Sequence, residues 1–200
     1  MACGVQKEVG GSGRWHTGGL GGTPRKEAFV RRVRFSVAMS LDGYIAGPKG
    51  EYDWIVMDPD IDFGALFKDF DTVLMGRKSY EAARQHGGGG GMPGMQAFVF
   101  SRTLRQDDCP DATVSDRPDE AVPALKAGTG KDIWLFGGGD LFRSLLDLGL
   151  VDTVEVAIIP VLLGSGVPLL PHPAARAKLR LTGHRVYEKT GTTALEYVVV

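Results

Sequence analysis

The sequence predicts an α/β fold in which one mostly parallel central sheet lies between two helical layers and an antiparallel hairpin ends the chain. Segments of strand character alternate with segments of helical period over most of the length. Glycine follows directly on two buried apolar segments, at Gly76 and Gly137. The last segment, 179–200, contains two strand patterns around a polar turn at 189–192. These observations predict a single three-layer domain.

The first predicted strand covers residues 33–39, where bulky apolar side chains alternate with small or polar ones. Its second face is nearly all small after Arg34, so another group can come close to the backbone there. The strand ends at Asp42-Gly43, a turn pair. Apolar residues at helical spacing from Phe63 to Phe70 predict a short amphipathic helix. Next come a buried strand over 72–75, a helix over 79–85 and a strand over 97–100.

The second half repeats the alternation. A helix is predicted over 119–126, where Pro123 is expected to interrupt it. The continuous apolar run at 133–136 predicts a strand buried on both faces. A helix with an apolar face follows over 141–146, with Gly149 as its stop signal, and the strand 154–159 precedes the final hairpin.

Composition limits the possible function classes. A chain of 200 residues with 43% hydrophobic residues can bury one sizeable core. The net charge of -1 gives no reason to expect nucleic-acid binding. The sequence has no long apolar run and no apolar signal segment, so we expect a cytoplasmic protein without membrane contact. Cys3 and Cys109 do not form a metal-type pair and the histidines lack zinc spacing, so we expect free thiols and no metal.

Residues 1–30 differ from the remainder of the chain. They are rich in glycine and polar residues and have no apolar period. Such a segment cannot bury enough apolar surface to offset the entropy of ordering it. We therefore expect residues 1–30 to be a disordered extension and residues 31–200 to form the domain.

Two strand-to-helix turns are candidate phosphate sites. In the first, GGGD at 137–140 follows a buried strand and opens a helix, so that an anion can approach bare backbone at a helix N-terminus. In the second, MGRKSY at 75–80 has the same arrangement, with Arg77 and Lys78 adding positive charge. Ser101-Arg102, at the end of another strand, is a third candidate. Neither the G-x-G-x-x-G nor the P-loop pattern is present.

The motifs SVAMSLDGYIAG, LMGRKSYE, VFSRTL, IWLFGGGDLFRSLL and GLVDTVEVAIIPVLLGSGVPLL occur in this order. Together they resemble the dihydrofolate-reductase-like superfamily, in the branch that includes the reductase domain of bacterial riboflavin biosynthesis. The resemblance covers residues 32–200. It implies NADPH as the cofactor, hydride transfer as the chemistry and a small-molecule substrate. The family often forms homodimers, and the C-terminal hairpin offers an edge for such a contact.

The resemblance also implies which residues contact the cofactor. Ala38 would contact the nicotinamide through its backbone, and Ile45 and Gly47 would belong to the loop that covers it. Ser101 and Arg102 would face the adenosine 2′-phosphate. The other phosphates would be held by the two glycine turns, at Gly76, Arg77, Lys78, Ser79, Gly137, Gly138, Gly139, Asp140 and Leu141.

The proton donor is harder to assign. In dihydrofolate reductases a carboxylate near the start of the first helix supports protonation of the substrate. Asp62 is the nearest candidate here, with Asp60 beside it and Asp42 as an alternative. An aspartate before an amphipathic helix is usually its N-cap, and Phe63 fits the position of the family's acid better than Asp62 does. We therefore expect Asp62 to be a cap first and a catalytic acid second.

Three interpretations remain open. The first is an NADPH-dependent reductase of a pterin-, pyrimidine- or sugar-derived substrate, with 5-amino-6-(5-phosphoribosylamino)uracil reductase-type activity as one option. The second is a dinucleotide-binding protein of the same fold without turnover. The third is a domain whose glycine turns bind nothing. Substrate specificity would lie in the loops 51–60 and 87–94.

Overall fold

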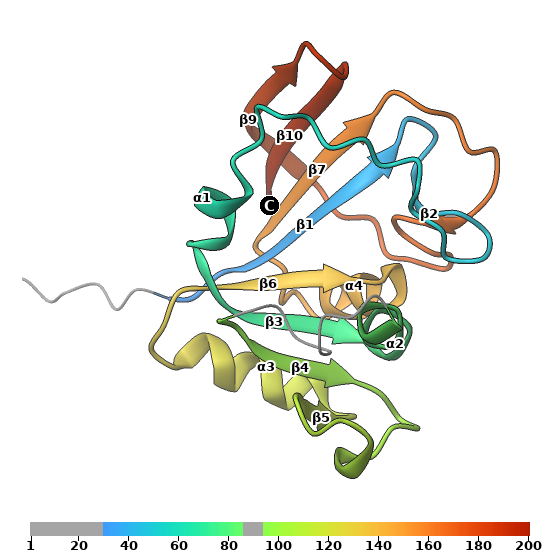
Figure 1. Ribbon diagram of the computed structural model, residues 1–200. Coiled ribbons are helices and arrows are strands. Elements are labelled where there is room, and N and C mark those ends of the chain that lie inside the picture. The colour runs from blue at the N-terminus through green and yellow to red at the C-terminus, as the bar shows by residue number, and fades with distance from the viewer. Residues whose placement is uncertain (1–29, 86–93) are drawn as a thin grey trace, which may run out of the picture.

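The computed structural model describes residues 30–85 and 94–200, which are built around one eight-stranded sheet (Figure 1). The strand order is β5-β4-β3-β6-β1-β7-β10-β9. The six strands from β5 to β7 pair in parallel, whereas β10 pairs antiparallel with both β7 and β9. The sheet strands are β1 (Val33–Ser40), β3 (Phe70–Gly76), β4 (Gln96–Phe100), β5 (Thr113–Ser115), β6 (Asp132–Gly137), β7 (Thr153–Ile159), β9 (Leu179–Tyr187) and β10 (Thr192–Val199).

The parallel strands from β5 to β7 and the antiparallel strands β9 and β10 confirm the predicted fold class. Residues 1–29 of the segment predicted to be disordered lie outside the described residues, as do residues 87–93 of the predicted specificity loop 87–94. Within the described ranges, no helix is long and apolar enough to cross a membrane.

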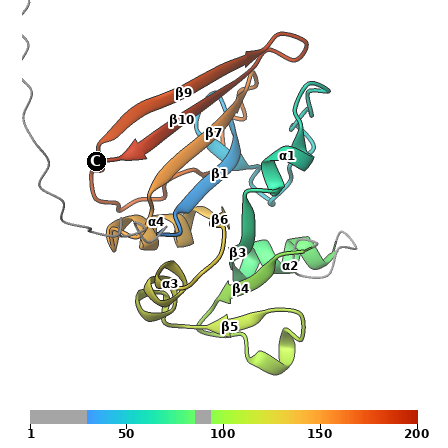
Figure 2. The same ribbon diagram turned by 90° about the vertical axis from the view of Figure 1, so that its left-hand side faces the viewer.

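Helices cover both faces of the sheet (Figure 2). They are α1 (Phe63–Phe67), α2 (Arg77–Gln85), α3 (Pro118–Ala127) and α4 (Gly139–Asp147). The connection from β3 to β4 runs toward the β5 edge, whereas that from β6 to β7 runs toward the β9 edge. Because crossovers between parallel strands are right-handed, this reversal places α2 and α4 on opposite faces. Figure 2 shows α1 and α2 on one side and α3 and α4 on the other.

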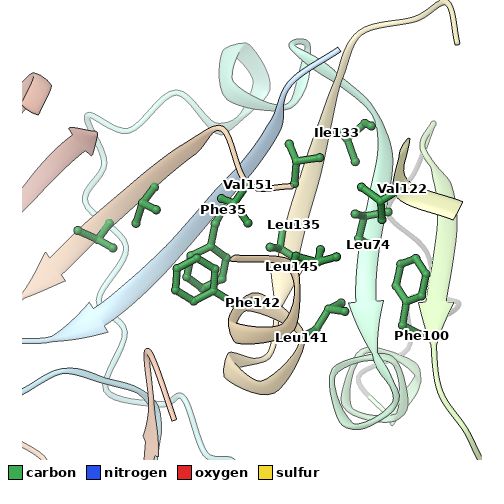
Figure 3. Close-up of a cluster of buried hydrophobic side chains, with 13 residues drawn as sticks. Phe35, Leu74, Phe100, Val122, Ile133, Leu135, Leu141, Phe142, Leu145 and Val151 are labelled. Carbon is green, nitrogen blue, oxygen red and sulfur yellow. The ribbon is translucent and has the colours of Figure 1, made fainter. Parts of the chain in front are cut away.

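Each face has its own apolar core. Under α3 and α4, the rings of Phe35 and Phe142 stack with centroids 3.9 Å apart, and Leu145 and Val122 are fully buried beside them (Figure 3). Under α1 and α2, Trp134 of β6 packs with residues of β3 and β4. The three predicted layers are therefore present.

Two local predictions were wrong. Phe70 was placed on the first helix, but α1 ends at Phe67 and Phe70 begins β3, where it pairs with Asp132 of β6. The pairing of Phe70 with β6 therefore determines its conformation, although its spacing from Phe63 and Phe67 fits a helix. Pro123 was expected to interrupt its helix, yet α3 runs from Pro118 to Ala127 without a break. The carbonyl that Pro123 leaves without a donor belongs to Asp119, in the exposed first turn, where water can replace the missing bond.

The sequence pattern also failed to predict several elements of two or three residues. A second, two-stranded sheet joins β2 (Tyr44–Ala46) to β8 (Val167–Pro168). A 3-10 turn, η1 (Gln106–Asp108), and β5 lie between β4 and α3. Elements of two or three residues are too short to show a period, and their pairing depends on distant parts of the chain.

Candidate functional site

The candidate site lies at the carboxyl ends of the parallel strands. At the neighbouring strands β3 and β6 the chain turns to opposite faces, into α2 and α4 respectively, and ligands of open α/β sheets bind at such reversals. A Cβ atom on Gly76 would lie 3.8 Å from both the carbonyl oxygen of Gly137 and the amide nitrogen of Gly138. The two predicted glycine turns are thus in contact across the reversal.

The turn after β6 exposes backbone rather than side chains. Gly137 has φ +138, a conformation that favours glycine, and the peptide bond between Gly137 and Gly138 is cis. Gly138 caps α4, and its carbonyl accepts the amide hydrogen of Phe142 at 3.0 Å. The preceding amides, of Gly139, Asp140 and Leu141, therefore have no acceptor within the helix and form its positive end. This is the geometry of an anion site.

The side chains around this turn have different roles. Leu141 is buried in the core, so only its backbone can serve a ligand. Asp140 is exposed and its carboxylate lies 3.6 Å from Arg143 of the same helix. The Ser79 hydroxyl of α2 would lie 3.6 Å from a Cβ on Gly138, so it faces the glycine turn. Ser79 therefore offers a hydroxyl to the same space as the α4 amides.

Arg77 and Lys78 are the first two residues of α2, and their side chains have different surroundings. Arg77 donates to both carboxylate oxygens of Glu81, at 3.0 and 3.1 Å, one turn along the same helix. Lys78 is exposed and makes no hydrogen bond or ion pair within 30–85 and 94–200. Positive charge at a helix start opposes the helix dipole, so Lys78 gains no local stabilisation from its position.

The sheet opens beside the glycine turns. β1 pairs with β6 only from Val33 to Phe35, whereas it pairs with β7 from Arg34 to Ser40. The indole nitrogen of Trp134 donates to the Ser36 carbonyl at 3.1 Å, where the β1–β6 ladder has ended. Figure 1 shows β1 and β6 diverging toward their carboxyl ends. Ala38, predicted to contact a nicotinamide, lies on this unpaired side of β1.

The segment with Ile45 and Gly47 reaches the glycine turn through β8. β2 pairs with β8, and a Cβ on Gly139 would lie 2.6 Å from the carbonyl oxygen of Pro168. Gly139 thus permits the contact between α4 and β8. Ile45 and Gly47 are therefore held on the same side of the molecule as the α4 N-terminus.

Asp42 anchors the segment that contains Ile45 and Gly47. Its surroundings do not favour the protonated form that a proton donor needs. Its carboxylate accepts hydrogen bonds from the Ser40 hydroxyl at 2.6 Å, the Gly164 amide at 2.7 Å and the Leu163 amide at 3.1 Å. These bonds, with that from Ser40 first, hold the pKa of Asp42 below its ordinary value. The carboxylate form is favoured, which suits an anchor.

Asp62 caps α1, as expected. Its carboxylate accepts the amide hydrogen of Ala65 at 2.9 Å, and its side chain is exposed. α1 itself is tied to the site by aromatic contacts, because the Phe67 ring lies 5.2 Å from Trp134 and Trp134 lies 5.2 Å from Phe136. Phe136 directly precedes Gly137. The catalytic role of Asp62 stays a prediction.

Ser101 and Arg102 lie apart from the glycine turns. They follow β4, which is two strands from β6 and so about 10 Å away in the sheet. Both line a surface hollow between the ends of β4 and β5, together with Ser115 and Asp116. Arg102 makes no hydrogen bond or ion pair in the part of the chain that the structure describes. The three predicted anion sites thus lie in a row along one edge, as an extended dinucleotide requires.

Asp58 is a second anchor, and no local sequence pattern marks it. The residue is 2% exposed, and its carboxylate accepts from the amide and hydroxyl of Thr190, at 3.1 and 2.9 Å, in the turn of the C-terminal hairpin. Burial alone would raise its pKa, but bonds from the Asp60 amide and Thr190 hold the pKa below the ordinary value. Lys189 adds an ion pair to Asp60 at 2.7 Å. The loop 51–60 is thereby fastened to the hairpin.

Among the described residues, no three His, Cys, Asp or Glu side chains come together as a metal site would require. Cys109 is buried and free.

The chain matches the family model of the RibD C-terminal domain over residues 31–192. It is 36% identical over 178 residues to YyaP, an uncharacterised protein of Bacillus subtilis (strain 168), covering 84% of this chain and 94% of YyaP. It is 26% identical over 167 residues to the riboflavin biosynthesis protein RibD of Corynebacterium ammoniagenes, covering 74% of this chain and 49% of RibD. The chain therefore spans about half the length of that RibD.

Solved structures show the same fold. A protein assigned to riboflavin biosynthesis in Shewanella sp. PV-4 superposes with a TM-score of 0.71 at 25% identity, covering 85% of this chain and 99% of that one. The dihydrofolate reductase of Enterococcus faecalis, solved with NADP(H), superposes with a TM-score of 0.62 at 16% identity, covering 84% of this chain and 96% of that one. The second likeness concerns the fold alone.

Proposed function

The chain belongs to the RibD C-terminal domain family, and on that premise we propose that it is an NADPH-dependent reductase that transfers a hydride to a small pterin-, pyrimidine- or sugar-derived substrate. One observation carries the proposal. The β1–β6 ladder ends at Phe35 beside the two touching glycine turns, so a flat ring can approach the unpaired backbone of β1 while its phosphates meet helix N-termini.

The residues present fit a dinucleotide. Glycine at 137 and 138 leaves open the space that a side chain would fill opposite Ser79. Lys78 and Arg102 supply positive charge that has no other partner in the described ranges. When bound, the nicotinamide supplies the hydride.

The chain's own residues would position the reactants and exclude water. The α4 amides and the Ser79 hydroxyl would bind the pyrophosphate, and the backbone of Ala38 would orient the nicotinamide. Phe67, Trp134 and Phe136 form an apolar wall on the face where α1 lies, and such a wall suits a planar heterocycle. Substrate reduction also needs a proton, for which Asp62 is the candidate acid.

A dinucleotide-binding protein without turnover is the second candidate. This candidate is favoured because both candidate acids already have structural hydrogen bonds. Asp62 caps α1, and three donors hold Asp42 in its carboxylate form. Consumption of NADPH separates the two candidates. The assay follows loss of NADPH absorbance with pterins, aminopyrimidines and ribityl- or ribosyl-aminopyrimidines. No consumption, despite tight NADPH binding, would favour the second candidate.

Coenzyme binding itself is tested by thermal unfolding with NADPH and with NADH. A ligand present at a hundred times its dissociation constant stabilises a protein by about 2.7 kcal/mol, which raises the melting temperature measurably. We expect NADPH to raise it. If saturating amounts of both coenzymes leave the melting temperature unchanged, the proposed function is wrong.

Asp62 is tested with two substitutions. Asp62→Asn keeps a capping oxygen and removes the acid, whereas Asp62→Ala removes both and should cost about 1 kcal/mol of unfolding free energy. If Asp62 donates the proton, both variants lose turnover at neutral pH. If it only caps α1, Asp62→Asn keeps full turnover, and the proton must come from elsewhere.

A further inference from the structure

The hollow at the ends of β4 and β5 is formed by the two strand ends and the segment between them. It is lined by Ser101, Arg102, Leu104, Gln106, Val114, Ser115 and Asp116. The Ser101 amide donates to the Ser115 carbonyl at 3.0 Å, which joins the two strand ends. Leu104 and Val114 are half-buried, and most of the exposed surface that lines the hollow is polar.

Most polar groups of the hollow are engaged in building it. The Gln106 side-chain amide donates to the carbonyls of Cys109 and Ala112, at 3.0 and 2.7 Å, and its carbonyl oxygen accepts from the Val114 amide at 3.0 Å. The Ser115 hydroxyl accepts from the Arg117 amide at 3.1 Å. The Gln106 and Ser115 side chains therefore have few donors and acceptors left for a ligand.

Two charged side chains in the hollow are different. Arg102 and Asp116 are both exposed, and within the described residues neither makes a hydrogen bond or an ion pair. Asp116 is nevertheless near Arg117, because it joins Asp119 and Glu120, with Asp119 first, in raising the pKa of that arginine. A cation and an anion thus remain available in one small site.

These two charges act in opposite directions on an adenosine ribose. A 2′-phosphate is attracted by a guanidinium and repelled by a carboxylate. A ribose with free hydroxyls has no charge to be attracted, but its hydroxyls can donate to a carboxylate, as they do to the acidic residue of NAD-binding folds. A site built to exclude NADH would not need Asp116.

We propose that Asp116 sets the coenzyme selectivity of this site: it opposes the 2′-phosphate that Arg102 attracts and accepts hydrogen bonds from an unphosphorylated ribose, so that the protein binds both NADPH and NADH. The inference rests on the proposed function, because it assigns the hollow to the adenosine end of the coenzyme.

The test measures dissociation constants for NADPH and NADH by calorimetry on the full chain at low and moderate salt. The variants are Asp116→Asn, Arg102→Gln and Asp107→Asn. Asp107 is the matched control because it is exposed, lies in η1 next to the hollow and does not line it, while its substitution changes the net charge equally. The probes 2′-AMP and 5′-AMP repeat the comparison without the nicotinamide half.

Wild-type protein should bind both coenzymes. Asp116→Asn should raise the affinity ratio of NADPH over NADH about three- to tenfold, less so at higher salt, because one repulsion and one hydrogen-bond acceptor are removed. Arg102→Gln should lower the ratio, and Asp107→Asn should leave it unchanged. The same directions are expected for 2′-AMP against 5′-AMP.

Two other results would overturn the assignment in different ways. If both coenzymes bind and Asp116→Asn leaves the ratio unchanged, or shifts both affinities equally, Asp116 is not a selectivity residue while the proposed function stands. If neither coenzyme binds the folded wild-type protein, the proposed function and this inference both fail. Circular dichroism of each variant verifies folding, and Asp116→Ser serves as a second substitution.

Discussion

The two ends of the central sheet use charge in opposite ways. At the amino ends of the strands the arginines are paired: Arg34 donates to Glu155 at 2.7 and 3.0 Å and lies 4.7 Å from the Phe70 ring, and Arg32 donates to Asp132 at 2.6 Å. At the carboxyl ends, Lys78, Arg102 and Asp116 make no hydrogen bond or ion pair within the described ranges, and Asp116 has only a longer-range attraction to Arg117. Charges at one end of the sheet are therefore used to stabilise the fold, whereas these three charges at the other end remain exposed and unpaired among the described residues.

The largest loss of stability is expected for Arg34→Met. Arg34 is 12% exposed at its side chain, and so is Glu155, so the substitution leaves a largely buried carboxylate unpaired. We expect a loss of about 3–5 kcal/mol of unfolding free energy, measured by urea denaturation, with coenzyme affinity unchanged below the melting temperature. Arg117→Met, which removes an exposed arginine with acidic partners, is the control and should cost far less. Equal losses would contradict the distinction.

The corresponding substitution at the carboxyl end is Gly138→Ala. Gly138 has φ -86, which any residue adopts, and the added Cβ would make an ordinary 3.6 Å contact with the Ser79 hydroxyl. Stability should change little, whereas NADPH affinity should fall about tenfold, equivalent to about 1.4 kcal/mol, because the methyl group fills the phosphate space. Gly128→Ala, at the end of α3, is the control. Unchanged affinity in Gly138→Ala would remove this turn from the site.

The buried carboxylate at the amino end makes stability depend on pH. Asp132 is 4% exposed, and although burial alone would raise its pKa, the hydrogen bonds from Arg32 hold the pKa below the ordinary 3.8. A depressed folded pKa stabilises the fold above the unfolded value, and this contribution is lost as the pH falls through the folded pKa. Asp132→Asn should therefore lose about 1–2 kcal/mol at neutral pH, and its difference from wild type should shrink below pH 3.8. A constant difference across the series would exclude this linkage.

The smallest effect is expected for Glu81→Gln. The pair of Arg77 with Glu81 is exposed on both sides, and such a pair contributes under about 0.5 kcal/mol. Its removal frees Arg77 for the ligand, so thermal unfolding should be nearly unchanged while NADPH affinity rises about twofold. A fall in affinity would mean that Glu81 positions Arg77 for binding.

Much of this arrangement could be predicted because it depends on neighbouring residues. A buried apolar run followed by glycine and a helical period marks both Gly76 and Gly137, and the structure places these turns in contact. Other features depend on contacts between residues far apart in sequence. Asp58 meets Thr190, Gly139 meets Pro168, and Asp116 shares a hollow with Arg102, and none of these pairs leaves a local pattern. Phe70 shows the same limit, since its partner across the sheet is Asp132.

The anchoring of the loop 51–60 has a consequence for how such proteins diverge. The Gly47 amide donates to the Glu51 carbonyl at 2.8 Å at one end, and Asp58 is bound to Thr190 at the other. Between these points Tyr52, Val56 and Met57 are exposed. A segment fixed at both ends can exchange side chains, or gain residues, at an entropic cost that grows only slowly with length. Residues 52–57 are therefore the part of this loop that can vary from one relative to another, and new ligand preferences can evolve there without rebuilding the sheet.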